Sequence, residues 1–140
     1  MLDLVEAFAA TGEHMHESER HRLILSAIQD RPVATVADLV ALAAAVADRV
    51  RYRKGSTNVE TTALEAFDWE LGVCQDQAHV MVAVCRSIGL PARYVSGYFY
   101  AAGEPELASH AWVDVCTDLQ ASHWLSLDVT HRCPTDERHI

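Results

Sequence analysis

The 140-residue sequence is poor in basic residues, glycine and proline, and each shortage excludes a class of protein. It contains 11 Lys and Arg against 20 Asp and Glu, a net charge of −9 that disfavours binding to nucleic acid or to an acidic membrane surface. Its longest apolar run, residues 39–47, is far shorter than the roughly 20 residues of a membrane-spanning helix. With 6 Gly, 4 Pro and half of its residues apolar, the sequence is neither disordered nor collagen-like. We therefore expect one domain, residues 1–140.

The sequence also lacks the usual features of a secreted protein. Its first residues include Asp3 and Glu6, where a signal peptide carries basic residues. The cysteines form no Cys-x-x-Cys pair and no regular framework; they are Cys74, Cys85, Cys116 and Cys133. We expect a cytoplasmic protein whose cysteines are free thiols, at least one of them available for chemistry.

Helices are expected in the first half of the sequence and strands at its end. Apolar residues at helical spacing predict helices over 17–29, from a Thr35 cap to about Val50, and over 74–87, with a short helix starting near Thr61. Strand-like segments follow at 92–100, 109–116 and 123–129. Because short loops join these strands, they should pair antiparallel. The predicted fold class is α+β, with a helical part at 1–50 and a core at 52–140.

A candidate catalytic triad follows from strand alternation and from one helix start. His110 shares a strand face with Trp112, and Asp128 lies on the opposite face from Leu127. If the two strands are neighbours, His110 and Asp128 lie side by side, and the carboxylate can fix the imidazole tautomer. Cys74 begins a helix, where unpaired N–H groups favour a thiolate and could hold an oxyanion. Spacing alone is weak evidence for this trio.

Four blocks of the sequence resemble the bacterial transglutaminase-like superfamily. They are Gly72–His79 around the cysteine, Cys85–Tyr98, Ser109–Val115 around the histidine and Trp124–Thr130 around the aspartate, and the tail Pro134–Ile140 is similar too. The resemblance runs from about Tyr52 to Ile140. It implies a papain-like transglutaminase core in which the cysteine helix packs on a C-terminal antiparallel sheet. It also implies that Cys74 is the nucleophile, His110 the general base and Asp128 its orienter.

The resemblance further implies acyl transfer through a thioester, without a cofactor. The Cys74 thiolate would attack an amide carbonyl of a peptide or protein substrate, and ammonia or an amine would leave. Water as acceptor would make the protein a protease or amidase, whereas an amine would make it a cross-linking acyltransferase. The motif itself does not choose between them.

The sequence departs from the family pattern at three places. Asp114 stands where the family usually has Glu, and Val129 where it usually has Pro; both changes leave the triad intact. Longer relatives continue beyond Ile140 into a further strand, so the core would lack a C-terminal strand. An exposed sheet edge could then promote homodimerisation.

The remainder of the site is less determined by the sequence. Besides the Cys74 N–H group, a side chain should contribute to oxyanion binding, and Tyr52, Trp69 and Gln75 are candidates. Trp112 could line the acyl pocket. No metal site is expected, because the Cys and His residues lack paired ligand spacing. The histidines His14, His16 and His21 fit a solvated, charged helix better than a zinc site.

Two other functions compete with the enzyme hypothesis. The first is a catalytically silent transglutaminase-like binding module, against which the retention of all three triad residue types argues. The second is an arylamine acetyltransferase, which uses the same order of Cys, His and Asp. Those enzymes approach the cysteine through an Arg-Gly-Gly segment, whereas this sequence has Glu-Leu-Gly-Val at residues 70–73.

Overall fold

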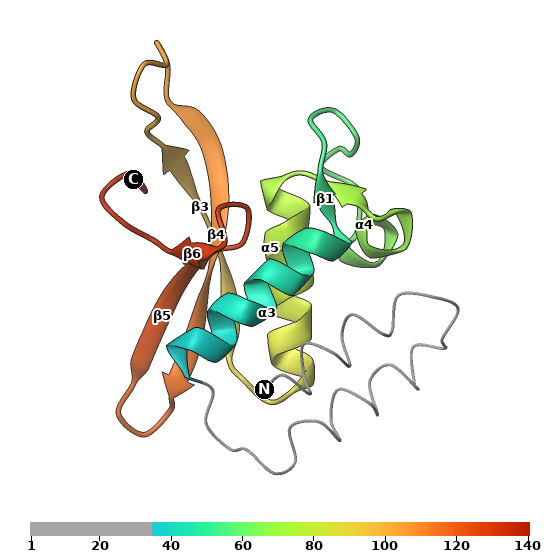
Figure 1. Cartoon of the computed structure of the whole chain (residues 1–140). Coiled ribbons are helices and arrows are strands. Elements are labelled where there is room, and N and C mark those ends of the chain that lie inside the picture. Colours follow the sequence, from blue (N-terminus) through green and yellow to red (C-terminus); the bar gives the residue numbers. More distant parts are fainter. Residues whose placement is uncertain (1–34) are drawn as a thin grey trace.

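The computed structural model describes residues 35–140 of the chain. In chain order its elements are α3 Val36–Arg49, β1 Arg51–Tyr52, α4 Ala63–Trp69, β2 Leu71–Gly72, α5 Cys74–Ser87, β3 Ala92–Phe99, β4 Ala108–Asp118, β5 His123–Asp128 and β6 Cys133–Pro134. Helices precede the main sheet, which confirms the α+β fold class (Figure 1). The helix expected over 17–29 and the histidines His14, His16 and His21 lie outside the described residues.

Two of the described helices begin at threonine caps. The Thr35 hydroxyl accepts the Asp38 N–H group and the Asp38 carboxylate accepts the Thr35 N–H group, so this capping box starts α3 as expected. Thr62 and Glu65 make the same reciprocal pair at α4. Among residues 35–140, no helix has both the length and the apolar character needed to cross a membrane.

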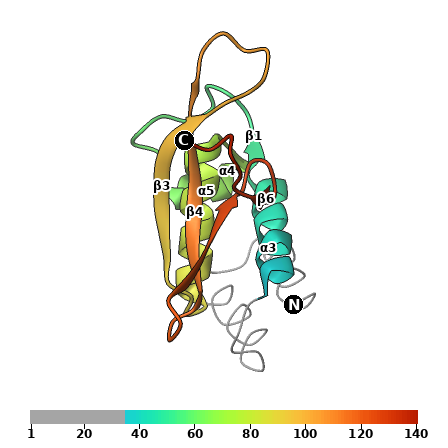
Figure 2. The same cartoon turned by 90° about the vertical axis from the view of Figure 1, so that its left-hand side faces the viewer.

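The main sheet is antiparallel, in the order β3-β4-β5-β6. Val113 at its centre pairs with Tyr94 on one side and Leu127 on the other. On one face Val113, Val115 and Leu127 are fully buried, and they pack with α3 and α5 in one hydrophobic core. Figure 2 shows both helices lying along the sheet. The opposite face carries His110 and Asp128, because side chains alternate along each strand.

The C-terminal residues return to the edge of β3. Tyr98 exchanges two backbone hydrogen bonds with Ile140, and the Tyr100 N–H group donates to the Arg138 carbonyl. A Cβ atom at Gly97 would lie 2.5 Å from the Ile140 carbonyl oxygen and from the Trp112 ring, so only glycine allows this close approach. This part of the β3 edge is thus covered by the chain itself, while homodimerisation stays a prediction.

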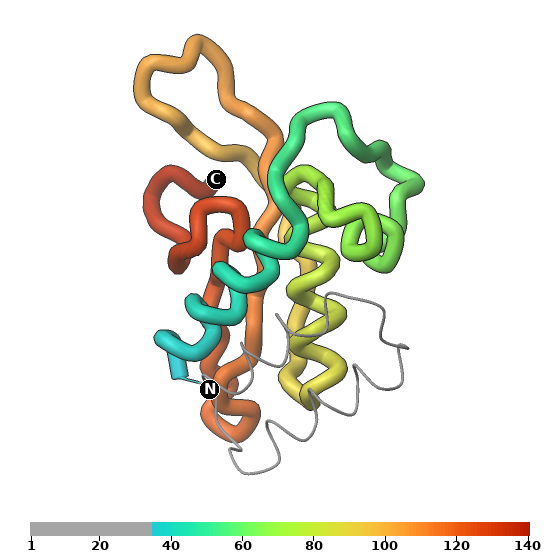
Figure 3. The backbone as a smooth tube through the Cα atoms, turned by 45° about the vertical axis from the view of Figure 1, so that its right-hand side comes forward, coloured from blue at the N-terminus to red at the C-terminus, as the bar shows by residue number. Residues whose placement is uncertain are grey.

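A two-stranded parallel pair supports the start of α5. Tyr52 of β1 pairs with Gly72 of β2, directly before the helix. In Figure 3 the chain after α3 runs past the start of α5. A Cβ atom at Gly72 would lie 2.7 Å from the Asp76 Cβ atom and 3.0 Å from Val50. Because Gly72 has no side chain, its backbone can pack closely against the first turn of α5, and β2 can lead directly into that helix.

Candidate active site

Cys74 is the first residue of α5, as expected from the sequence. The Asp76 carboxylate accepts hydrogen bonds from the Val73 N–H group, at 2.8 Å, and from the Thr57 hydroxyl. These contacts fix the helix entry and tie it to the loop before α4. The first N–H groups of a helix have no acceptor within it, so the turn that holds Cys74 can bind a developing oxyanion.

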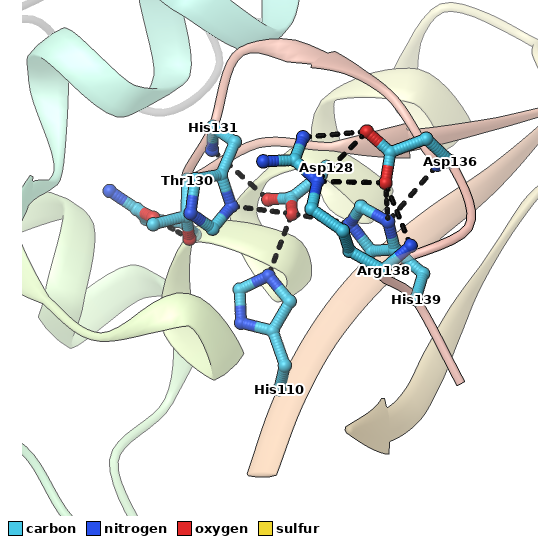
Figure 4. Close-up of polar contacts among 8 residues, drawn as sticks. His110, Asp128, Thr130, His131, Asp136, Arg138 and His139 are labelled. Atoms are coloured by element: carbon cyan, nitrogen blue, oxygen red, sulfur yellow. Dashed lines mark hydrogen bonds and ion pairs between the residues drawn. The ribbon is translucent and has the colours of Figure 1, made fainter. Parts of the chain in front are cut away.

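His110 and Asp128 meet across the β4–β5 pair. Asp114 pairs with Ser126, which places Asp128 opposite Trp112 and one diagonal step from His110. His110 Nε2 lies 2.7 Å from Asp128 Oδ2, and both side chains are buried (Figure 4). The structure therefore brings these two predicted residues together, in the arrangement that holds an imidazole in one tautomer.

Both groups of this pair have shifted pKa values. Burial by itself would lower the pKa of His110, but hydrogen bonding to Asp128 and to Cys74 outweighs it and raises this pKa to about 9. Burial opposes ionisation of Asp128, yet hydrogen bonds from His110, His139 and His131 hold the pKa of this carboxyl well below its usual range. The favoured state is therefore a carboxylate beside an imidazolium.

Cys74 interacts with the other side of the same imidazole. Nε2 of His110 is occupied by Asp128, so Nδ1 is the nitrogen that remains for the Cys74 side chain. The interaction with Cys74 contributes to the raised pKa of His110.

A buried glutamine fixes the spacing between helix and sheet. Gln77 on α5 donates to the Val50 carbonyl and accepts from Thr130, two residues after Asp128.

Two histidines at the same carboxylate were not found by sequence reasoning. His131 Nδ1 and His139 Nε2 each lie 2.7 Å from Asp128 Oδ2, the oxygen that His110 also contacts. The rings of His131 and His139 pack on Phe99, stacked and edge-on respectively. His131 lies three residues after Asp128, a local spacing that the sequence analysis did not use, whereas the return of the chain to β3 brings His139 to the site.

The other candidate residues lie on different elements of the fold. Trp112 is buried and packs edge-on against His139, with ring centroids 5.2 Å apart. Tyr52 and Trp69 are about half exposed, on β1 and at the end of α4, and Gln75 follows Cys74 in α5. Their contributions to substrate or oxyanion binding stay predictions.

Asp114, another carboxylate on the same strand as His110, is engaged elsewhere. Its carboxylate accepts hydrogen bonds from Ser126 and, at 3.0 Å, from Arg93. Asp128, by contrast, is the carboxylate that contacts His110.

The comparison with protein families identifies the core. The family model of the transglutaminase-like superfamily matches residues 26–129. The uncharacterised protein Rv2569c of Mycobacterium tuberculosis is 37% identical over 124 residues, which cover 82% of this chain and 39% of that protein. The uncharacterised protein ML0607 of Mycobacterium leprae is 35% identical over 108 residues, 73% of this chain and 37% of that protein. The chain thus spans less than two fifths of the length of these relatives.

Solved structures similar to this one include the following two. A protein of Cytophaga hutchinsonii described as a "Putative Cysteine Protease" has a TM-score of 0.64 and 27% identity, over 83% of this chain and 38% of that chain. The periplasmic domain of TgpA from Pseudomonas aeruginosa has a TM-score of 0.55 and 25% identity, over 91% of this chain and 48% of that chain.

The cytoplasmic localisation of this protein stays a prediction from the sequence. The chain belongs to the transglutaminase-like superfamily and has a fold that supports cysteine-based catalysis.

Proposed function

We propose that this domain cleaves an amide bond of a peptide or protein by cysteine-dependent acyl transfer. The observation that supports this function is the buried 2.7 Å contact between His110 Nε2 and Asp128 Oδ2, which leaves Nδ1 for Cys74. A thiol, an imidazole and a carboxylate in this order make up a complete nucleophilic system.

In the first step, the Cys74 sulfur forms a bond to the amide carbonyl carbon, and the carbonyl oxygen becomes an oxyanion at the start of α5. His110 then donates its Nδ1 proton to the departing nitrogen. The carbon–nitrogen bond breaks, an amine or ammonia leaves, and the acyl group remains on Cys74 as a thioester. Asp128 stabilises the imidazolium before the transfer and keeps the ring in place after it.

In the second step, neutral His110 accepts a proton from the acyl acceptor as that acceptor attacks the thioester carbonyl. The sulfur leaves as a thiolate, and the imidazolium is restored. We favour water as the acceptor, because the similar Cytophaga structure is described as a "Putative Cysteine Protease". An amine acceptor would give transamidation by the same residues.

The test measures both outcomes with the purified chain. Fluorescent casein reports hydrolysis, and a glutamine peptide with a fluorescent primary amine reports transamidation. We expect activity that is lost in Cys74→Ala and kept in Cys116→Ala, which removes a thiol on β4 away from the triad. Mass spectrometry after brief iodoacetamide treatment should show Cys74 modified first. If Cys74 reacts no faster than free cysteine and neither substrate is turned over, the domain is a silent binding module.

A further inference from the structure

Four side chains at the triad carry atoms that bind metals. His110, Asp128, His131 and His139 each offer one such atom, and these four atoms lie within 4.8 Å of one another. They come from separate places in the chain: His110 from β4, Asp128 from the end of β5, His131 from the following turn and His139 from the C-terminal tail (Figure 4). The fold thus builds a ligand set that the sequence spacing did not predict.

The hydrogen bonding of this cluster is crowded. Asp128 Oδ2 lies 2.7 Å from each of three imidazole nitrogens, while Oδ1 receives the backbone N–H group of His131 at 3.1 Å. An ionised carboxylate has about four acceptor sites over two oxygens, so each oxygen can accept about two hydrogen bonds. The three donors at Oδ2 exceed that number. A cation held between the oxygen and the three nitrogens would replace all three of these bonds at once.

We propose that His110, Asp128, His131 and His139 form a zinc-binding site. Three imidazoles and a carboxylate are a donor set that zinc accepts in four-coordinate geometry. Bonds of about 2.0–2.1 Å place neighbouring ligand atoms roughly 3.3 Å apart. In the structure the oxygen lies 2.7 Å from each nitrogen, and no two of the four ligand atoms are more than 4.8 Å apart. The separation that zinc requires falls between these two values.

The surroundings fit entry and orientation of a metal. His131 has 37% of its side chain exposed, whereas those of His110, His139 and Asp128 are buried, so His131 marks the side open to solvent. His139 Nδ1 now accepts the Asp136 backbone N–H group at 3.1 Å, and Asp136 Oδ1 lies 3.4 Å away. Metal binding at Nε2 would leave the ring proton on Nδ1, so this contact would have to be exchanged for a hydrogen bond from Nδ1 to Oδ1. A carboxylate in this position commonly orients a zinc-bound histidine.

Zinc at this site would switch the triad off, a consequence that rests on the proposed function. A metal bound to Nε2 of His110 displaces the Nε2 proton of the imidazolium to solvent and confines the remaining ring proton to Nδ1, the nitrogen left for Cys74. His110 could then no longer accept a proton from the acyl acceptor, and Asp128 would be withdrawn to the metal. Catalysis needs no metal in this scheme, and zinc acts as a reversible inhibitor.

Binding is tested independently of activity, in the full chain carrying Cys74→Ala, so that the nucleophile cannot be a ligand. Calorimetric titration with Zn²⁺ and the visible absorption of Co²⁺ give the stoichiometry and the geometry. We expect one four-coordinate site without a sulfur-to-cobalt absorption band. His131→Gln and His139→Gln should each weaken this site by at least about 100-fold, whereas His123→Gln, an exposed histidine at the start of β5, should not.

Each outcome of the metal-binding experiment either supports or contradicts the proposed zinc site. His131 is partly exposed, so its variant is expected to fold, and thermal unfolding in EDTA verifies the fold of every variant. Equal binding by all variants would place the metal elsewhere, and absence of binding would show that the histidines only hold Asp128; either result overturns the proposal.

Turnover of the wild-type chain forms the second arm. One equivalent of Zn²⁺ should stop turnover and EDTA should restore it. Metal binding without any turnover in metal-free protein would refute the proposed function and leave the site standing. Full turnover by zinc-loaded protein would overturn the inhibitory role.

Discussion

His139 Nε2 lies 2.7 Å from Asp128 Oδ2, the same oxygen that His110 contacts at 2.7 Å. The C-terminal tail and the β4–β5 pair thus meet at one buried carboxylate. His139 reaches this position only when residues 138–140 pair with β3. The geometry of the candidate site therefore depends on this pairing of the C-terminal tail.

Replacing Cys74 by alanine should abolish turnover and leave the fold intact. The change removes the sulfur that forms the thioester, while truncation of a partly buried residue outside the core centre costs only about 1 kcal/mol. Steady-state turnover and thermal unfolding of the purified variant check both parts. Full residual activity would show that Cys74 is not the nucleophile.

Asp128→Asn should lower turnover by about 10²–10⁴-fold. The amide lacks the charge that supports the His110 imidazolium, and its NH₂ group can favour the wrong tautomer. The raised pKa of His110, about 9, predicts that wild-type turnover declines above that pH as the imidazolium loses its proton. In the variant this basic limb should move to lower pH. Unchanged turnover with an unmoved limb would assign the orienting role to another residue.

The His110–Asp128 pair should stabilise the fold within a defined pH window. The pKa of His110 is raised from 6.5 to about 9, so its contribution is complete below about pH 6.5 and is lost as the pH rises through 9. The pKa of Asp128 is lowered from 3.8, so its contribution is present above about pH 4 and is lost as the pH falls. The difference in unfolding free energy between wild type and His110→Gln should therefore be largest between about pH 4 and 6.5. Denaturant titrations at several pH values measure it, and a difference that grows toward pH 9 would contradict the assignment.

Gly97→Ala should destabilise the protein by about 1–3 kcal/mol and displace the C-terminal tail. The added Cβ atom would lie 2.5 Å from both the Ile140 carbonyl oxygen and the Trp112 ring, so one of them must move. Ser109→Ala, an exposed change on the neighbouring strand, is the matched control. Denaturant unfolding measures the loss, and NMR signals of the His139 ring report whether it leaves Asp128. Equal stability of the two variants would mean that the tail contributes nothing to the fold.

Much of the fold could be predicted from local patterns. The Thr35 cap, the helix from Cys74 to Ser87 and the strand starts at Ala92 and His123 agree with the sequence analysis, because each depends on nearby residues. The strand alternation also placed His110 and Asp128 on matching faces. Their contact then required only that the two strands be neighbours, as short loops favour.

Other features depend on contacts between distant parts of the chain. The sequence by itself determined the α+β class and the order of Cys74, His110 and Asp128, since spacing, caps and alternation are local properties. Only the tertiary structure decided that His139 shares Asp128 with His110 and with the nearby His131. Nothing local encodes the close approach at Gly97 that returns the chain to β3, and three imidazoles can converge on one oxygen only once that long-range pairing has formed.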